Sequence, residues 1–350
     1  VMTQEKTFQA ALIGAGMVAR THVAALAESK AVTLRGIASR SGTSAAKLAE
    51  TAAELTGDTV RTYGSVAEVA ADPAVDFAVI VTPPDARAAL IRPLAAAGKH
   101  ILLEKPVART AAEAREVVAI ARAAGVRLGL VFQHRMRAAS RKAAELVASG
   151  ALGTLGLVEI AVPWWRDQSY YDEPGRGTYA RDCGGVLINQ AIHSIDLALS
   201  LTGPVRRVRA MARTSRFHDM EAEDFVVAGL EFDGGAFGSL TASTGCFPGR
   251  AESLGLHFDR ASLHLHSGAL RVDWRTGRSE SFGAAGGTGG RGDPMAFSHD
   301  LHQAMIEDFA AALSQGRAPV APGEAGLASQ DLIEAITRSA QSGAAEDLAA

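Results

Sequence analysis

The sequence has 350 residues, a length that predicts two domains rather than one. Hydrophobic residues make up 47% of it and charged residues 21%, the balance of an ordinary globular protein. A formal net charge of -3 argues against nucleic acid or an anionic membrane as a partner. Its two cysteines are too few for a disulfide framework. With neither a signal-peptide core nor a membrane-spanning stretch visible, we expect a cytoplasmic protein.

The first third of the sequence alternates short apolar stretches with helix-like segments. We expect strands at residues 8–13, 32–39, 77–81, 100–103 and 127–132, and helices ending near residue 28 and at 85–97 and 111–124. The run from Phe77 to Val81 is continuously apolar, as in a strand buried on both faces of a parallel sheet. Such repeated strand–helix units predict a doubly wound parallel sheet of the Rossmann type over residues 1–126.

After about residue 150 the pattern changes to short strands joined by glycine turns. We expect strands at 155–163, 205–212, 224–232, 236–244, 253–258, 262–266 and 269–274, and helices at 186–201, 299–314 and 324–340. The glycine-rich run 283–292 is interpreted as a hairpin loop. The pattern predicts a C-terminal α+β domain over residues 127–350, built on a large, mostly antiparallel open sheet. The fold class is therefore α/β plus α+β.

A glycine-rich turn follows the first strand and opens a helix. Gly14 permits the tight turn, Gly16 lets the backbone approach a pyrophosphate, and the small Ala19 allows close packing of the helix on the sheet. Met17 and Val18 lie at the helix N-terminus, where backbone amides and the helix dipole favour phosphate. The motif predicts a dinucleotide cofactor.

The end of the second strand is where a dinucleotide's ribose should lie. An acidic residue there would hold the free hydroxyls of NAD, but the strand ends in Ser39, Arg40 and Ser41. An arginine between two hydroxyls suits a 2'-phosphate. We therefore favour NADP and leave NAD open, because Arg40 could also be a solvated charge stacked on adenine.

Two further strands end in residues suited to a cofactor or to proton transfer. Thr82 and Pro83 close one strand in a rigid turn that would face the nicotinamide half of a dinucleotide. Glu104, Lys105 and Pro106 close the next. An ammonium between a buried strand and a proline can be partly desolvated, and its pKa then moves toward the working range of an acid–base group. The alternative is a surface lysine paired with Glu104.

A predicted helix at residues 186–201 carries a second polar group. Asn189, His193 and Asp196 are spaced so that they share one face of an α-helix, with apolar residues around them. Histidine suits proton transfer near neutral pH. The three residues predict a helix whose polar face lines a cleft, although a lone helical histidine is more often a core residue.

Taken together, these motifs resemble the Gfo/Idh/MocA family of oxidoreductases, and the resemblance covers essentially the whole chain. The residues that carry it are Gly14 and Gly16 with His22, the Thr82-Pro83 turn, Lys99-His100 leading into Glu104-Lys105-Pro106, and Gly184-Gly185 through His193 to Asp196. The resemblance implies a nicotinamide cofactor and hydride transfer at a hydroxyl-bearing carbon of a sugar or cyclitol. It also implies a homodimer or homotetramer formed through the C-terminal sheet.

The resemblance also implies residue roles. Lys105 occupies the position of a lysine that contacts the substrate hydroxyl and the nicotinamide ribose, and His193 matches a histidine near the same hydroxyl. Inositol dehydrogenase-like members carry an aspartate where this chain has Asn189, so a carboxylate relay there is in doubt and Asn189 would orient rather than ionise. The sequence 189–193 is similar to a branch that includes nucleotide-sugar uronate 3-dehydrogenases and dihydroxyphthalate dehydrogenases.

Aromatic and arginine residues cluster before this helix and predict a wall for a sugar or carboxylated ring. The substrate candidates are Gln133, Arg135, Trp164, Tyr171, Arg176, Gln190 and Asp196. Packing at an oligomer interface is the alternative for each aromatic residue. His264 and His266 lie on one strand face but lack a third ligand, so we expect no metal site.

We therefore expect an NAD(P)-dependent dehydrogenase or reductase with Lys105 and His193 as its acid–base and alkoxide-stabilising groups. Two alternatives remain open. One is a redox-neutral enzyme that retains its cofactor and runs internal oxidation–reduction, as in glycosidase or isomerase reactions. The other is a non-catalytic, NAD(P)-sensing regulatory protein, which would need neither residue.

Overall fold

Contacts between residues divide the chain into two compact units. In the computed structural model, which describes residues 7–283 and 298–348, unit 1 comprises residues 1–133 and 297–327. Unit 2 comprises residues 134–296 and 328–350. The expected glycine-rich loop at 283–292 lies, except for its first residue, outside the described residues.

The described residues of unit 1 form a parallel sheet of six strands. They are β1 (Phe8–Ile13), β2 (Val32–Ala38), β3 (Arg61–Tyr63), β4 (Phe77–Ile80), β5 (His100–Leu103) and β6 (Leu128–Leu130). The strand order β3-β2-β1-β4-β5-β6 reverses between β1 and β4, as in a doubly wound Rossmann sheet. Every residue of β4 is buried, because its apolar side chains meet helices on both faces of the sheet. The predicted Rossmann architecture is confirmed.

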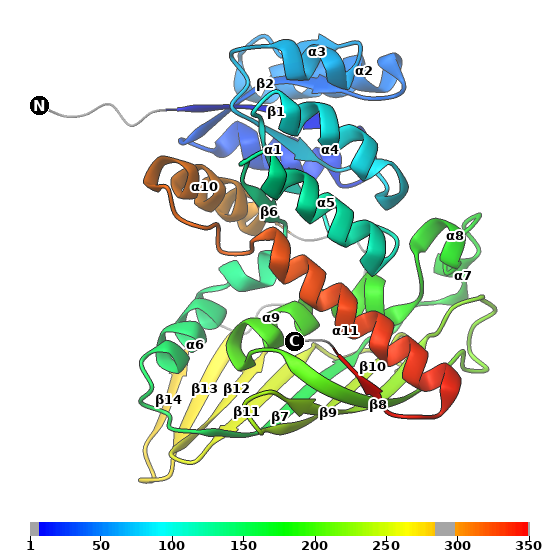
Figure 1. Ribbon diagram of the computed structural model, residues 1–350, viewed down its shortest axis with the longest axis vertical. Helices are drawn as coiled ribbons and strands as arrows, with labels where there is room; N and C mark the ends of the chain where they lie inside the picture. The colour runs from blue at the N-terminus through cyan, green and yellow to red at the C-terminus, as the bar shows by residue number, and fades with distance from the viewer. Residues whose placement is uncertain (1–6, 284–297, 349–350) are drawn as a thin grey trace, which may run out of the picture. The chain divides into compact units, whose positions relative to one another are not determined.

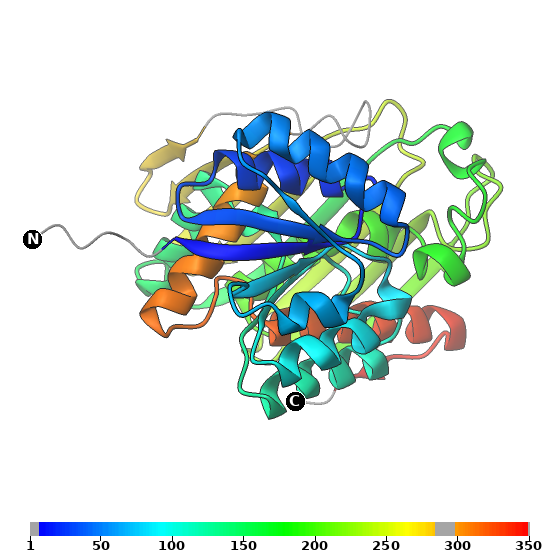
Figure 2. The ribbon, with the colours of Figure 1, turned by 90° about the horizontal axis from the view of Figure 1, so that it is seen from above.

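Helices cover both faces of this sheet. They are α1 (Ala19–Glu28), α2 (Gly42–Thr56), α3 (Val66–Ala71), α4 (Arg87–Ala96), α5 (Ala111–Ala123) and α10 (Asp300–Gln315), with short 3-10 turns at Pro84–Ala86 and Gln133–Met136. The blue helices α1 and α2 lie on one side of the sheet in Figure 2, and the cyan to teal helices α4 and α5 lie on the other. Gly98 and Gly125 have φ of 72° and 68°, which explains why α4 and α5 end just before them.

The division into units differs from the expected boundary at residues 126 and 127. Unit 1 also contains β6 and α10, although α10 follows strands β7 to β14 of the large sheet in the chain. The orange helix α10 packs beside α1 (Figure 2). Its buried residues, among them Ile306 and Phe309, face unit 1, and the Phe309 ring lies 5.2 Å from that of Phe77.

The described residues of unit 2 form a mixed sheet of nine strands. They are β7 (Leu155–Pro163), β8 (Val205–Arg213), β9 (Phe225–Phe232), β10 (Phe237–Ser243), β11 (Ser253–Phe258), β12 (Ala261–His266), β13 (Ala269–Trp274), β14 (Ser279–Phe282) and β15 (Glu346–Asp347). Their order is β14-β13-β12-β11-β7-β10-β9-β8-β15. Only the pairing of β7 with β10 is parallel within this described sheet, so the predicted mostly antiparallel sheet is confirmed.

Helices of unit 2 lie along one face of this sheet (Figure 1). The described helices of unit 2 are α6 (Ala138–Ala148), α9 (Ile192–Thr202), the short α7 (Gln168–Tyr171) and α8 (Tyr179–Asp182), and the long α11 (Gly323–Ser342). The first residues of α11 belong to unit 1. Buried and exposed residues alternate along β8 and β9, which gives the sheet a second, solvent-facing side. No helix within the described ranges is long and apolar enough to cross a membrane.

Candidate active site

The glycine turn after β1 has the geometry that a dinucleotide needs. Gly14 has φ of 114°, and a Cβ there would lie 3.0 Å from Val81 Cγ2 and 3.2 Å from the Thr82 backbone nitrogen. A Cβ at Gly16 would meet no described atom within 4 Å. The first glycine is therefore required by the fold itself, whereas the second leaves open space above the turn.

Two features beside this turn also fit a dinucleotide. At the N-terminus of α1, no side chain of the described residues caps the helix at Val18, and Met17 is exposed. The hydroxyl oxygen of Thr82 is buried and has no hydrogen-bond partner among the described residues. Backbone amides without a capping side chain suit a pyrophosphate, and the Thr82 hydroxyl needs a partner that a bound cofactor would supply.

The residues assigned to the ribose of the cofactor follow β2, at the same edge of the sheet. Ser41 is the N-cap of α2, and its hydroxyl accepts a hydrogen bond from the Ser44 backbone nitrogen at 3.3 Å. Arg40 is exposed and Ser39 is half-buried. The structure thus places an exposed guanidinium beside a helix N-terminus, an arrangement that suits an anion.

Arg87, which the sequence analysis missed, links two strand ends. Its guanidinium donates to the carbonyl oxygen of Thr82 at 2.9 Å after β4, and also to that of Glu104 after β5. The Arg87 residue is only 2% exposed. A basic residue in the first turn of a helix opposes the helix dipole, and that was the signal that Arg87 serves something other than solubility.

Glu104 points into the interior of unit 1. His22 Nε2 lies 2.8 Å from Glu104 Oε1, and His302 Nε2 of α10 lies 3.7 Å from the same oxygen. The Lys105 backbone nitrogen donates to the other carboxylate oxygen, Oε2, at 3.1 Å, and the Lys105-Pro106 bond is cis. His302 was not predicted because the sequence does not show that α10 returns to this unit.

The groups around Glu104 decide its ionisation. Burial acts to raise the pKa of Glu104, but the hydrogen bond from His22 and the nearby His22, His302 and Lys105 outweigh it and lower the pKa to about 2. Burial lowers the pKa of His302 to about 4, against the opposing pull of the Glu104 carboxylate. At neutral pH a buried carboxylate ion therefore lies next to Lys105.

His193 lies in the first turn of α9 in unit 2. It is buried, and its ring stacks on that of His134 with centroids 4.9 Å apart and planes at 30°. Arg137 donates to His134 Nε2 at 2.8 Å and forms an ion pair with Glu252 at 2.8 Å. A buried charged network thus supports the imidazole that the sequence singled out.

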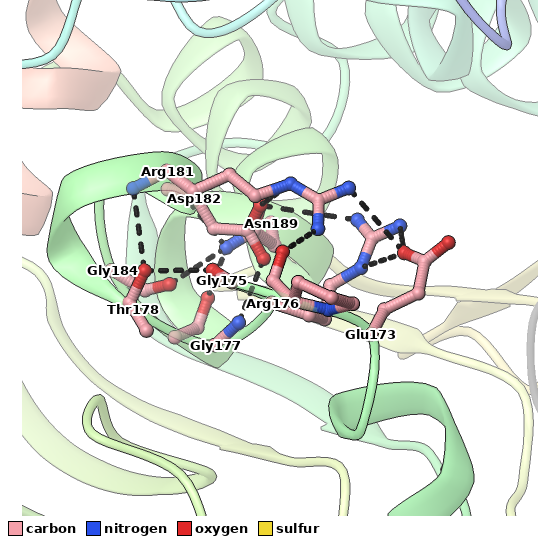
Figure 3. A network of polar contacts seen from close by, with 11 residues as sticks. Glu173, Gly175, Arg176, Gly177, Thr178, Arg181, Asp182, Gly184 and Asn189 are labelled. Carbon is pink, nitrogen blue, oxygen red and sulfur yellow. Dashed lines mark hydrogen bonds and ion pairs between the residues drawn. The ribbon is translucent and has the colours of Figure 1, made fainter.

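The expected single helix at 186–201 is interrupted. Residues Leu187–Ala191 form a π-helical turn before α9, a feature often found at functional sites. Asn189 in that turn donates its side-chain amide to the carbonyl oxygens of Gly184 at 2.8 Å and Gly185 at 3.1 Å (Figure 3). The wide turn breaks the α-helical spacing, so Asn189 contacts residues before the turn, whereas His193 contacts His134.

Glu223 holds the start of this helical segment and was also missed. Its carboxylate accepts from the backbone nitrogens of Gly185 and Leu187, each at 3.2 Å. A Cβ at Gly185 would lie 1.8 Å from the Glu223 carbonyl oxygen, so only glycine fits there. Gly185 is therefore explained by the close backbone approach of Glu223, and Gly184 by its φ of 144°.

Arg135 and Asp196, both expected to contact substrate, pair with each other. The guanidinium donates to the two carboxylate oxygens at 2.7 and 2.6 Å, and Asp196 is fully buried. Burial raises the pKa of Asp196 to about 6, although Arg135 opposes this shift. The pair joins α9 to the turn at Gln133–Met136.

Of the aromatic candidates, Trp164 is half-buried beside an arginine, whereas Tyr171 is buried. The Arg166 guanidinium lies over the rings of Trp164 at 5.3 Å and Tyr170 at 5.7 Å, and Arg176 lies over Tyr170 at 4.8 Å. The indole nitrogen of Trp164 is buried without a hydrogen-bond partner in the described chain. Tyr171 is buried, with its hydroxyl 2.6 Å from that of Thr244.

The remaining candidates have mixed surroundings. Arg176 forms an ion pair with Glu173 at 2.7 Å, within the polar network of Figure 3. The side-chain oxygen of Gln133 is buried and has no partner within residues 7–283 and 298–348, whereas Gln190 is buried in the π-helical turn. His264 and His266 are both exposed on β12. In the described chain, the cluster with metal-ligand spacing is instead His22, Glu104 and His302.

Comparisons with known proteins agree with this fold. A family model described as an oxidoreductase family with an NAD-binding Rossmann fold matches residues 8–132, and one described as the GFO/IDH/MocA C-terminal domain matches residues 140–264. The WlbA dehydrogenase structure from Bordetella pertussis, in complex with NADH and UDP-GlcNAcA, is 27% identical with a TM-score of 0.79. That match covers 99% of this chain and 100% of WlbA.

Curated relatives match a smaller part of the chain. Trans-1,2-dihydrobenzene-1,2-diol dehydrogenase of Mus musculus is 33% identical over 184 residues, which is 52% of this chain and 53% of that protein. The rhizopine catabolism protein MocA of Rhizobium meliloti is 28% identical over 196 residues, 56% of this chain and 57% of that protein. The chain thus matches about half the length of these relatives.

Proposed function

This chain belongs to the GFO/IDH/MocA oxidoreductases, and from that premise we propose that it is an NAD(P)-dependent dehydrogenase or reductase acting on a CH–OH group. One observation carries the proposal. The open dinucleotide turn at Gly14 and Gly16 lies at the carboxyl edge of the same sheet as Lys105, whose backbone is fixed by a buried carboxylate ion. A sensor of the cofactor would not need an anchored lysine there.

The proposed cofactor is NADP. Gly14, Gly16, Met17 and Val18 would hold the pyrophosphate, and Thr82 with Pro83 would contact the nicotinamide half. Arg40, exposed beside the N-terminus of α2, favours a 2'-phosphate over the free hydroxyl of NAD. Ser41 supports the arrangement through its cap, rather than through a hydroxyl that is free to contact the ribose.

The proposed chemistry needs one positive group and one proton-exchanging group. When bound, the nicotinamide supplies the acceptor or donor for the hydride of a secondary carbinol carbon. Lys105 would stabilise the developing alkoxide, and His193 would exchange the hydroxyl proton near neutral pH. Asn189 would hold the turn before α9 in place and would not itself ionise.

The proposed substrate is a sugar, cyclitol, sugar acid or related cyclic diol. The mouse relative is named for a diol, and the Bordetella structure holds UDP-GlcNAcA. In unit 2, the half-buried Trp164 and Tyr170 alternate with Arg166 and Arg176, a group that would stack a ring and attract a carboxylate.

A screen of NAD and NADP against sugars, cyclitols, uronates and aromatic diols tests the function. Thermal shift reports binding and nicotinamide absorbance reports turnover. We expect a net absorbance change with at least one substrate. Conversion without net absorbance change, by protein that retains its cofactor through purification, would instead identify a redox-neutral enzyme. Cofactor binding without conversion of any substrate would favour a sensor.

We further propose that copies of the chain associate through the solvent-facing side of the large sheet. Leu157 and Phe237 are direct neighbours on β7 and β10, and each is 56% exposed. Met211 lies on the same side and is also exposed. Such apolar residues on an open sheet suit a dimer or tetramer interface. Light scattering of wild type and of Phe237→Asp should show the variant with the smaller mass.

A further inference from the structure

Three buried side chains from distant parts of the sequence meet in unit 1. Glu104 ends β5, His22 lies on α1, and His302 lies on α10. Both imidazole Nε2 atoms approach one carboxylate oxygen, at 2.8 and 3.7 Å, and their rings meet edge to face with centroids 5.1 Å apart. The other carboxylate oxygen accepts the Lys105 backbone N–H.

The two oxygens of Glu104 therefore have different partners. Oε1 faces the interior histidines, and Oε2 faces the residue proposed to act on substrate. The Glu104 backbone is held as well, because its nitrogen donates to the Ile80 carbonyl oxygen at 2.9 Å and its carbonyl oxygen accepts from Arg87. Any change at Oε1 can therefore act on Lys105 mainly through the carboxylate.

We propose that His302 is a positioning residue for Lys105: together with His22 it holds the ionised Glu104 carboxylate in place, and that carboxylate fixes the Lys105 backbone. The proposal rests on the function proposed for Lys105. It gives α10, which follows strands β7 to β14 of the large sheet in the sequence, a role at the cofactor-binding edge of unit 1.

The groups packed around Glu104 support this assignment. His22 on α1, His302 on α10 and Lys105 after β5 all lower the pKa of the carboxyl group. Arg87 on α4 faces the Glu104 carbonyl, and His299, the residue before α10, lies 3.2 Å from the Glu28 carboxylate. With Glu104 7% exposed, water contributes little to stabilising its charge, so these partners determine whether it stays ionised.

The same three residues have the spacing of metal ligands, but a hydrogen-bonded network fits them better. Tetrahedral zinc sites with bonds near 2.0 to 2.1 Å hold their ligand atoms roughly 3.3 Å apart. His22 Nε2 and Glu104 Oε1 are already closer than that, at the 2.8 Å of an ordinary hydrogen bond. A proton, rather than a metal ion, accounts for the contact.

The test compares His302→Phe, which keeps a ring but loses the polar nitrogens, with His302→Gln, whose amide can still donate to the carboxylate. Ile306→Val, a buried change on the same helix, is the control for loosened packing. Each holoenzyme is assayed for kcat and KM across pH, and the Glu104 carboxyl carbon is titrated by NMR with Glu104→Gln as the assignment control. Metal content is measured on the same samples.

For His302→Phe we expect kcat to fall about tenfold with little change in KM for the cofactor, and the acid limb of the rate profile to move up by about one pH unit. The carboxyl titration should move in the same direction. His302→Gln should restore most of the lost kcat and most of the shift in the rate profile, and Ile306→Val should match wild type. An unmoved carboxyl titration in His302→Phe, or a stoichiometric bound metal, would overturn the proposal. A moved titration with an unchanged rate profile would instead refute the role of Lys105.

Discussion

Glu104 in unit 1 and Asp196 in unit 2 are both buried carboxylates, yet their pKa values shift in opposite directions. Burial acts to raise both. Around Glu104, His22, His302 and Lys105 outweigh burial and lower the pKa to about 2. Around Asp196, a single arginine does not, and the pKa rises to about 6. The number of positive or hydrogen-bonding partners, rather than depth of burial, therefore decides the direction in which each pKa shifts.

This difference matches the roles proposed for the two units. Unit 1 keeps a carboxylate ion next to Lys105 over the whole working range of pH. This suits a lysine that must keep its positive charge to stabilise the alkoxide. Unit 2 places His193 on the helix that carries Asp196, where the carboxyl group titrates only about one unit below neutral pH. In the proposed mechanism, unit 1 holds a charge and unit 2 exchanges a proton.

Replacing Lys105 gives the largest expected effect. Lys105→Met removes the cation beside Glu104, and we expect kcat/KM to fall by about 10³-fold with cofactor affinity largely kept. Steady-state kinetics and cofactor titration measure the two quantities. Lys47→Met, an exposed lysine on α2, is the matched control. Unchanged turnover in Lys105→Met would mean that unit 1 does not supply the charge for catalysis.

The two carboxylates should give opposite pH dependence of stability. For Glu104, with a folded pKa of about 2 below the usual 4.5, the stabilising effect is full above pH 4.5 and lost as the pH falls toward 2. For Asp196, whose folded pKa is raised from 3.8 to about 6, the stabilising effect is full below pH 3.8 and is lost as the pH rises through 6. Each effect is about 3 kcal/mol, because one pKa unit corresponds to about 1.4 kcal/mol.

Urea unfolding of wild type, Glu104→Gln and Asp196→Asn at a series of pH values measures these slopes. The free energy of unfolding of wild type minus that of the variant should rise with pH for Glu104 and fall with pH for Asp196. Slopes of the same sign would show that the contrast between the two sites is wrong.

The sequence predicted the features that depend on local pattern. The apolar run of β4, the glycines that end α4 and α5, and the alternating strands of unit 2 all follow from periodicity and backbone preference. The Gly14 turn was found because its function demands a local conformation. Such signals lie within a few neighbouring residues.

Features that depend on distant contacts were missed. An amphipathic helix shows which of its faces is buried but not what covers it, so nothing placed α10 and His302 in unit 1. The signal at Arg87, a basic residue in the first turn of a helix, was not used, and the π-helical turn has no distinct spacing in the sequence. The pairing of Arg135 with Asp196 likewise required knowing which segment α9 meets.

Arg40 tests whether unit 1 also sets the choice of cofactor. Arg40→Ala should weaken binding of NADP about tenfold, the cost of losing one charge-assisted contact, and leave NAD nearly unchanged. Fluorescence titration of both cofactors measures the ratio. Arg61→Ala, another exposed arginine of unit 1, is the control. Equal weakening of NAD and NADP would remove the 2'-phosphate assignment.

Glu223 offers the smallest and most selective test, because it should affect only unit 2. Its carboxylate accepts two backbone N–H groups at the start of the segment that carries Asn189 and His193. Glu223→Ala leaves those groups without their acceptor, and we expect a loss of about 1 kcal/mol in the free energy of unfolding. Loosening this turn lets His193 depart from its stack on His134, so kcat should fall several-fold.

Glu223→Gln retains one acceptor oxygen and should recover part of the unfolding free energy and part of kcat. Glu145→Ala, an exposed change on α6, should lower neither quantity. Cofactor affinity distinguishes local from general damage, because no residue assigned to the cofactor lies in unit 2. If Glu223→Ala weakened cofactor binding as much as turnover, the division of labour between a charge-holding unit and a proton-exchanging unit would fail. If only turnover fell, the role of unit 2 would be narrowed to the geometry of His193.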